Sequence, residues 1–155
     1  MSSEREKLLE ELTNEVRANQ RATAIVDDAT DALLGVNRTD GRCLDLLEQR
    51  GQMSAGELAR ESGLTTGAIT AVIDRLERAG YARRERHPGD RRKVLVSLTP
   101  LAAERAQPVF APMEEAVGEV LATYDDAQLA LLLTFLRRMR DVSVAVIGQF
   151  SRSPP

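Results

Sequence analysis

Histidine, cysteine and tryptophan are almost absent: the 155-residue chain has one histidine, one cysteine and no tryptophan. A zinc site or a Cys–His catalytic group needs several such residues close together. His87 stands on a basic segment with no nucleophile or pair of carboxylates beside it in the sequence. The glycine-containing stretch "GELARESG" lacks the lysine of a phosphate-binding loop. We therefore expect no enzyme activity, no metal and no cofactor.

The single Cys43 also excludes an internal disulfide, which fits a reducing compartment. Its neighbours Leu44, Leu46 and Leu47 place it on the apolar side of a predicted helix, so we interpret it as a buried thiol rather than a redox sensor. Long apolar runs of the roughly 18 residues that span a bilayer are missing. The start "MSSEREKLLEEL" is charged from its fourth residue, unlike a signal peptide. These absences predict a cytoplasmic protein without a membrane partner.

Aromatic residues make up only 3% of the chain, so its core must be aliphatic. Apolar residues recur at helical spacing over residues 4–34, and a shorter helix is expected over 39–50. Two more helices are predicted near the end of the chain, at 99–123 after a Thr-Pro start and at 125–150 after a capping box. The fold class expected is mainly α, with one small β-hairpin.

Two short helices with clear start and stop signals occupy the middle of the chain. Ser54 and Glu57 form the S-x-x-E pattern of a capping box, and Gly63 ends that helix in the left-handed conformation. Thr65 caps the next helix, which ends at Gly80. Two short helices joined by a tight turn that contains glycine are typical of a helix-turn-helix.

The second of these helices has one aliphatic face and one face of small or polar residues. The aliphatic face consists of Ile69, Val72, Ile73 and Leu76. The opposite face consists of Gly67, Thr70, Ala71, Asp74 and Arg78, flanked by Thr66 and Arg75. A face of small residues can enter the DNA major groove, where threonine bonds base edges and methyl groups contact thymine. The alternative is an ordinary solvent-exposed face, because small outer residues are common.

A basic segment follows in a chain whose formal net charge is −3. Residues 83–93 hold six basic and two acidic side chains around the turn Pro88-Gly89-Asp90, and alternating residues on both sides predict a β-hairpin. An arginine at a projecting hairpin tip suits the narrow, strongly negative minor groove. Asp90 can hold the guanidinium of Arg92 in place. The alternative is a charge run that only meets solvent.

These features adjoin one another in the run "LTTGAITAVIDRLERAGYARRERHPGDRRKVLVSLTPLAAE", residues 64–104. The run resembles the winged-helix core of the MarR family of bacterial transcription regulators. The resemblance rests on "DRLERAGY" at the end of the second helix, on the D-x-R pattern of Asp90 and Arg92, and on the strand "VLVSLTP" leading into the next helix. It is close over about Thr39–Glu104 and looser over the flanking helices.

The resemblance implies a homodimer, joined through N- and C-terminal helices, that binds a pseudopalindromic site on double-stranded DNA. It implies a repressor more often than an activator. For many members it also implies a small aromatic or phenolic effector, often an anion, that binds in the cleft between the dimer helices and the winged domain and releases the DNA. The long apolar stripes of the first and last helices agree with a dimer, because monomers rarely expose such patches; the alternative is that these helices pack on each other.

The domains expected are a dimerisation helix at 1–36, a winged helix-turn-helix domain at 37–98 (helix-turn-helix 54–79, wing 81–98), C-terminal dimerisation helices at 99–150 and a disordered tail at 151–155.

The resemblance also assigns DNA-contacting residues by position. Base contacts are expected from Thr65, Thr66, Ala68 and Thr70. Backbone contacts are expected from Arg75, Arg78, Arg86 and Arg91, with Arg92 in the minor groove, Asp90 beside it, and Ser54 as a helix cap near the DNA backbone. The alternative function is a winged helix that serves only as a protein–protein interaction module. Such a module is expected to lose the basic tip and to carry apolar anchors.

Overall fold

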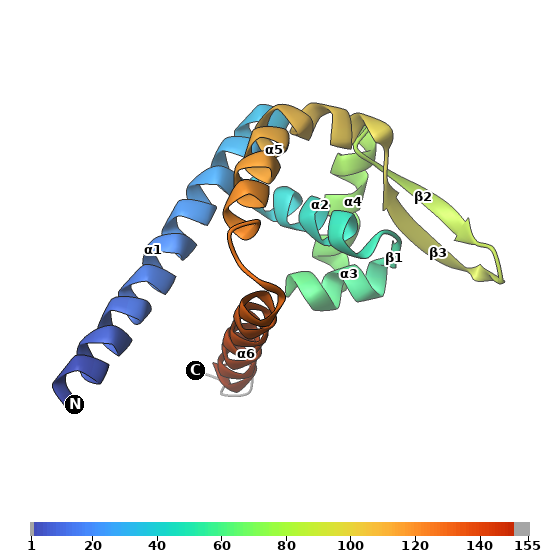
Figure 1. Ribbon diagram of the computed structural model, residues 1–155. Helices are drawn as coiled ribbons and strands as arrows, with labels where there is room; N and C mark the ends of the chain where they lie inside the picture. Colours follow the sequence, from blue (N-terminus) through green and yellow to red (C-terminus); the bar gives the residue numbers. More distant parts are fainter. Residues whose placement is uncertain (1, 151–155) are drawn as a thin grey trace. The chain divides into compact units, whose positions relative to one another are not determined.

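The computed structural model describes residues 2–150, apart from the side chains at positions 2, 91, 92, 147, 149 and 150. The expected disordered tail, 151–155, lies outside the described residues. The chain forms two compact units, residues 1–110 and 111–155. Figure 1 shows a mainly helical protein with one small antiparallel sheet, as the sequence predicts. The helices and strands in chain order are α1 (Ser2–Leu34), α2 (Arg38–Arg50), β1 (Met53–Ser54), α3 (Ala55–Ser62), α4 (Thr66–Arg78), β2 (Ala82–His87), β3 (Asp90–Leu98), α5 (Pro100–Leu121) and α6 (Asp126–Phe150).

The core of the first unit is aliphatic and lies where α2, α3 and α4 meet the sheet. Its most deeply buried side chains are Leu47, Leu58, Ile69, Ile73, Leu76, Val72, Val96 and Cys43. The four residues that the sequence places on the inner face of α4 are all among them. Because these side chains lie on one stripe of α4, their burial fixes which residues of that helix face outward.

The predicted start and stop signals of the two short helices are present in the structure. Ser54 and Glu57 make both bonds of the capping box, and Gly63 ends α3 with φ of 73°. The Thr65 side chain accepts a hydrogen bond from the amide of Ala68, 3.2 Å away, and so caps α4. The connection between α3 and α4 is therefore a tight, fully capped turn, as in a helix-turn-helix.

The sheet has the strand order β1-β3-β2, and β2 and β3 form the predicted hairpin, which extends away from the helices (Figure 1). The pairing shifts register between Arg86 and His87, close to the tip. The short strand β1 was not predicted, because it has only two residues and pairs through its backbone with Val96 and Leu95. It joins the start of the helix-turn-helix to the base of the hairpin.

Two hydroxyl groups hold the base of the hairpin against the helices. The buried Tyr81 donates its hydroxyl hydrogen to the carbonyl of Leu34, at the end of α1, over 2.9 Å. Thr99 donates to the carbonyl of Gly80 over 2.6 Å, and its amide donates to the carbonyl of Tyr81. The hairpin is thus anchored at both of its ends, while its tip projects.

Long apolar surfaces remain exposed on α1 and on α6. On α1 the exposed side chains include Leu8, Leu9, Leu12 and Ile25, and on α6 they include Leu131, Leu132, Leu133, Leu136, Val142, Val144 and Val146. The capping box predicted at the start of α6 is present, since Asp125 and Gln128 bond each other's amides at 2.8 and 2.9 Å. In the described part of the chain, no helix is long and apolar enough to cross a membrane.

Candidate nucleic-acid interface

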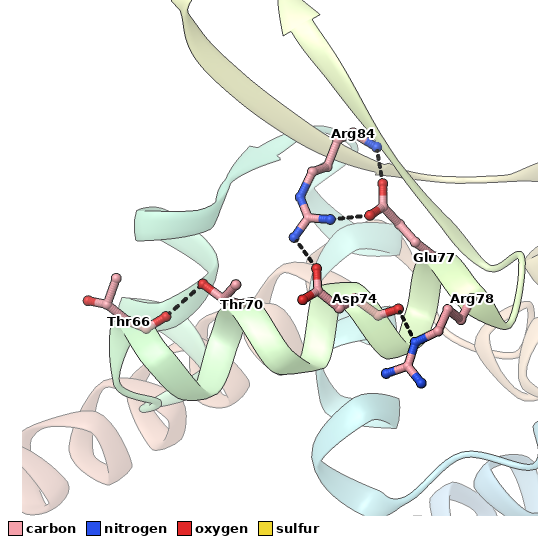
Figure 2. Close-up of polar contacts among 6 residues, drawn as sticks. All are labelled: Thr66, Thr70, Asp74, Glu77, Arg78 and Arg84. Carbon is pink, nitrogen blue, oxygen red and sulfur yellow. Dashed lines mark hydrogen bonds and ion pairs between the residues drawn. The ribbon is translucent and has the colours of Figure 1, made fainter.

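Helix α4 presents a face of small and polar side chains to solvent. Thr65, Thr66, Ala68 and Thr70, predicted to contact bases, are all exposed. The hydroxyl of Thr70 donates to the carbonyl of Thr66 over 3.0 Å, as Figure 2 shows. That bond uses the only hydroxyl proton, so the oxygen of Thr70 is left as an acceptor beside the side-chain methyl group. A helix with this face can approach an amino group or a thymine methyl on a base edge.

Arg84 on β2 holds the wing against α4 by binding two carboxylates of that helix (Figure 2). Its Nη2 lies 2.6 Å from Oδ1 of Asp74, and its Nη1 contacts Oε2 of Glu77. The backbone amide of Arg84 also donates to Oε1 of Glu77 over 2.9 Å. Bonding to Asp74, the largest cause, and to Glu77 raises the pKa of the Arg84 guanidinium. The carboxylate of Asp74, which would otherwise repel DNA phosphate from this face, is therefore paired with a cation.

Arg84 was not among the residues predicted for the site. In the sequence it is one of several arginines in a basic run. Its side chain is 34% exposed and its charge is directed back into the protein. The only signal in the sequence was the acidic pair Asp74 and Glu77, three residues apart on α4, which can face one cation.

The two arginines of α4 have different surroundings. Arg78 is exposed, and its Nε donates to the carbonyl of Asp74 over 3.2 Å, with the rest of the guanidinium pointing away from the helix (Figure 2). Arg75 turns to α2 instead, where Nε and Nη2 bind Oδ2 and Oδ1 of Asp40 at 2.9 and 2.6 Å. The prediction placed both at the DNA backbone. Arg78 has its terminal nitrogens directed away from the helix, whereas the 41%-exposed side chain of Arg75 has two of its three nitrogens bound to Asp40.

The predicted wing residues lie on the hairpin at or near its tip. Arg86 is exposed on β2, and Asp90 begins β3 as a half-buried residue. The side chains of Arg91 and Arg92 lie outside the described residues, so their predicted DNA contacts and the Asp90–Arg92 pair stay predictions. His87, expected near phosphate, accepts a hydrogen bond at Nδ1 from the amide of Gly89 over 3.0 Å and so shapes the turn.

Ser54, predicted as a cap near the DNA backbone, is fully engaged within the protein. Its hydroxyl donates to Oε2 of Glu57 over 2.7 Å and accepts from the amide of Glu57 over 3.2 Å. The bond from the hydroxyl is the largest cause that holds the pKa of the Glu57 carboxyl below its usual value, and a bond of 2.8 Å from the Ser54 amide to the same Oε2 adds to it. The structure therefore supports the cap, and a phosphate contact by Ser54 stays a prediction.

A cavity of about 250 Å³ lies within the first unit, between α1, α2 and the first part of α5. Its apolar walls include Leu34, Leu44, Leu98, Ala102, Ala106 and Phe110. Its charged walls are Asp27, Asp31, Asp45, Glu48, Arg38 and Arg42. Nη2 of Arg38 lies 3.5 Å from Oδ1 of Asp28, a residue that does not line the cavity. Acidic groups thus outnumber basic groups around a space large enough for a small organic molecule. The resemblance implies a ligand cleft between the dimer helices and the winged domain, but the residues that line it were not predicted.

The carboxyl of Asp45 is the most perturbed titratable group of the cavity. Burial, followed by repulsion from Asp27, Asp31 and Glu48, raises its pKa to about 6. Burial also raises the pKa of Asp31, with Asp27 and Asp28 adding to the effect. Both shifts have the same largest cause: burial disfavours the ionised carboxylate, and repulsion from neighbouring carboxylates adds to that effect.

Asp45→Asn is expected to stabilise the fold by about 1–2 kcal/mol near pH 7.5, allowing for solvent screening. A raised pKa means that ionised Asp45 destabilises the folded state at pH values above its unfolded pKa, near 3.8. The gain should shrink as the pH falls through about 6 and vanish below about 4. Urea unfolding at several pH values measures it, with Glu10→Gln on exposed α1 as the matched control. No gain near pH 7.5 would contradict an ionised Asp45 that burial and repulsion destabilise.

Cys43 is buried, as predicted from the sequence. Burial, the largest cause, raises the pKa of its thiol. A thiol with a raised pKa holds less of the reactive thiolate, which agrees with a packing role. Among the described residues, no cluster of three or more His, Cys, Asp or Glu side chains could hold a metal ion.

Comparison with known proteins places the chain in a family. The model of the MarR family matches residues 36–94, which run from the start of α2 to the wing. The HTH-type transcriptional regulator YcgE of Bacillus subtilis is 35% identical over 120 residues, covering 77% of this chain and 78% of YcgE. The chain belongs to the MarR family. MarR-family proteins, like the relative YcgE, are transcription regulators rather than enzymes, as the scarcity of catalytic residue types predicts.

Solved structures of MarR-type regulators share the fold. The transcriptional regulator PA4135 is 26% identical, with a TM-score of 0.57, and the match covers 84% of this chain and 96% of that one. NadR, solved in complex with 4-hydroxyphenylacetate, matches with a TM-score of 0.60 at 18% identity over 81% of this chain and 89% of NadR. The second likeness concerns the fold alone. Together they confirm the winged-helix fold of a MarR-type regulator.

Proposed function

We propose that this MarR-family chain is a cytoplasmic, sequence-specific regulator that binds a pseudopalindromic operator on double-stranded DNA as a homodimer. The observation that carries the proposal is the arrangement of α4 and the wing. Helix α4 exposes Thr66, Ala68 and Thr70, and Arg84 fixes the adjacent hairpin to the same helix through Asp74 and Glu77. A base-reading helix and a basic hairpin are thereby held as one surface.

Each part of this surface has a proposed contact. Bases are read in the major groove by Thr65, Thr66, Ala68 and Thr70. The DNA backbone is bound by Arg78, Arg86 and Arg91, and Arg92 enters the minor groove beside Asp90. Phosphate contacts supply affinity and orientation, while base contacts supply sequence preference. A homodimer places the second copy on a half-site about one helical turn away, so the operator is pseudopalindromic.

Selection of bound sequences from a random DNA pool tests the proposal directly. The expected result is enrichment of two inverted half-sites whose centres lie about 10 base pairs apart. Selection without any enriched sequence would contradict sequence-specific binding. It would instead favour the protein–protein interaction module. We propose that occupancy of such an operator near a promoter represses transcription.

Thr70→Ala is expected to reduce discrimination against mismatched operators by about 1–3 kcal/mol at the contacted base pair, because one base-edge contact is lost. Affinity for random DNA should barely change, since no charge is removed. Binding titrations with operator, single-mismatch and random DNA measure both quantities. The matched control is Thr23→Ala, which removes the same threonine-to-carbonyl hydrogen bond on α1. Equal losses on all DNA sequences would contradict a base contact by Thr70.

The cavity between α1, α2 and α5 is the proposed effector site. Its apolar wall, which includes Phe110 and Leu98, fits a small aromatic ring, and NadR supplies a precedent for a phenolic ligand in this fold. The lining holds four carboxylates and two arginines, and repulsion among the carboxylates adds to burial in raising the pKa of Asp45, so the cavity disfavours an anion. We therefore propose a phenolic or other aromatic effector that is neutral or carries an amine, rather than a carboxylate.

Two probes with the same ring separate these ligand classes. Tyramine and 4-hydroxyphenylacetate both carry a phenol, but one ends in an ammonium group and the other in a carboxylate. A ligand that binds the folded protein raises its melting temperature by mass action. Stronger stabilisation by tyramine is expected, and Asp45→Asn should reduce it. Stronger stabilisation by 4-hydroxyphenylacetate would contradict the charge argument, and no stabilisation by aromatic amines or phenols would remove the cavity as their site.

A further inference from the structure

An ion pair between Asp40 and Arg75 joins the start of α2 to α4. The side chain of Asp40 is 4% exposed, and both of its oxygens are bound by the same guanidinium. A buried carboxylate without a partner would be strongly unfavourable. The side chain of Arg75 is 41% exposed, so the pair is half-buried: the carboxylate is fixed in the packing between these helices, while one edge of the guanidinium meets solvent.

Both partners are held in place on their own helices. The amide of Asp40 donates to Oδ1 of the helix cap Asn37 over 3.0 Å, so the first turn of α2 cannot rotate freely. On α4, Arg75 stands beside the fully buried Leu76, two positions after Ile73. A planar guanidinium bound at two oxygens accepts only a narrow range of orientations. The pair thus limits both sliding and rotation of α4 on α2.

We propose that Arg75 is a positioning residue of the DNA-binding surface, which sets the rotation of α4 by binding Asp40 and not by binding DNA phosphate. The proposal rests on the DNA-binding function proposed above. Thr70 lies five residues before Arg75, so the rotation that the pair fixes also determines where the base-reading side chains point. Base contacts depend on such placement to within a fraction of an ångström.

The same turn of α2 also borders the cavity. Gly41, the residue after Asp40, lines it, and a β-carbon at Gly41 would overlap the carboxylate of Asp31. Asp31 therefore packs against the backbone of α2 from the cavity side. The ion pair of Asp40 with Arg75 connects this part of α2 to α4. A ligand that displaces Asp31 or α2 would therefore also shift α4, through the Asp40–Arg75 pair.

Asp40→Asn tests the proposal because a purely electrostatic effect and the loss of the positioning pair change the affinity for operator DNA in opposite directions. The substitution keeps the shape of the side chain but removes one negative charge, so a purely electrostatic effect would strengthen DNA binding. Loss of the positioning pair should instead weaken operator binding about tenfold, within the range for coupled residues of one ion pair. Asp28→Asn, which removes an equal charge from the exposed pair with Arg38, is the matched control and should not weaken binding. Operator binding by Asp40→Asn as tight as wild type would overturn the proposal.

Arg75→Lys supplies the second test. Lysine keeps the positive charge and could still bind a phosphate, but it cannot bind both oxygens of Asp40 with a planar group. A loss similar to that of Asp40→Asn is expected. The double variant Asp40→Asn/Arg75→Lys should be weaker than either single variant by no more than about threefold, because both changes break the same pair. Full binding by Arg75→Lys would show that charge alone suffices and would overturn the positioning role.

Hydrogen exchange on the free protein tests the pair without DNA. In Asp40→Asn, the amides of α4 should exchange faster than in wild type, while those of α6 serve as the internal reference. Unchanged exchange in α4 would overturn the proposal even if DNA affinity fell. If wild type selects no operator but the amides of α4 exchange faster in the variant, the result contradicts the proposed DNA-binding function. It still supports the proposal that the Asp40–Arg75 pair holds α4 in position.

Discussion

Leu136→Glu on α6 is expected to dissociate the proposed homodimer and to weaken operator binding by about 100- to 10,000-fold. Leu136 is 61% exposed in the single chain, so its replacement leaves the core of its own unit intact. In a two-fold dimer each substitution enters the interface twice, and the two glutamates are buried at the cost of desolvation and repulsion. A monomer binds one half-site alone and loses the high effective concentration of its linked second copy.

Sedimentation velocity and operator titration measure the two effects in the same preparation. Thr134→Glu is the matched control, because Thr134 is exposed on α6 but lies outside the apolar stripe of Leu129, Leu132, Leu133 and Leu136. That variant should remain dimeric and should keep its affinity. A Leu136→Glu protein that stays dimeric would remove this surface of α6 from the interface. A monomer that binds the operator as tightly as wild type would contradict dimeric recognition.

Arg92→Ala is expected to weaken operator binding by about 1–3 kcal/mol. The hairpin that carries Arg92 is fixed at its base by Tyr81 and Thr99 and along β2 by Arg84, so its tip is held in a defined place relative to α4. A guanidinium delivered to a narrow minor groove meets a strongly negative potential. Its loss removes both that attraction and the counterion release that accompanies it.

Titrations across a range of salt concentrations distinguish a DNA contact from a change in folding. The slope of log K against log salt should become shallower by about one for each phosphate contact that is lost. Arg17→Ala, which removes an arginine from the exposed surface of α1, is the control and should leave the slope unchanged. An Arg92→Ala protein with wild-type affinity and slope would remove the wing from the mechanism.

Local signals in the sequence were sufficient to predict most of the fold. The capping box at Ser54 and Glu57, the stop at Gly63 and the cap at Thr65 each depend on residues within one helical turn. The inner face of α4 follows from its 3.6-residue period. Strand β1 could not be predicted in this way, because two residues carry no period and their pairing partners, Val96 and Leu95, lie far along the chain.

The candidate site was predicted less completely, because arginines of one basic sequence look alike until their partners are known. Arg84 and Arg75 were indistinguishable from Arg78 in the sequence, yet each binds carboxylates brought near by folding. Asp40 is 35 positions from Arg75, and Asp74 is 10 positions from Arg84. The residues that line the cavity could not be named for the same reason, since its wall combines α1, α2 and α5. Long-range pairing decides which basic residues face inward and which can face DNA.

One measurement tests sequence-specific DNA binding most directly: binding of the purified protein to its own promoter fragment and to a scrambled fragment, across a salt series. We expect a complex with the promoter that is tighter than with scrambled DNA by at least about 1,000-fold and that weakens steeply as salt rises. Equal binding to both fragments at every salt concentration would contradict sequence-specific recognition at that promoter. No binding to either fragment at low salt would contradict DNA binding itself.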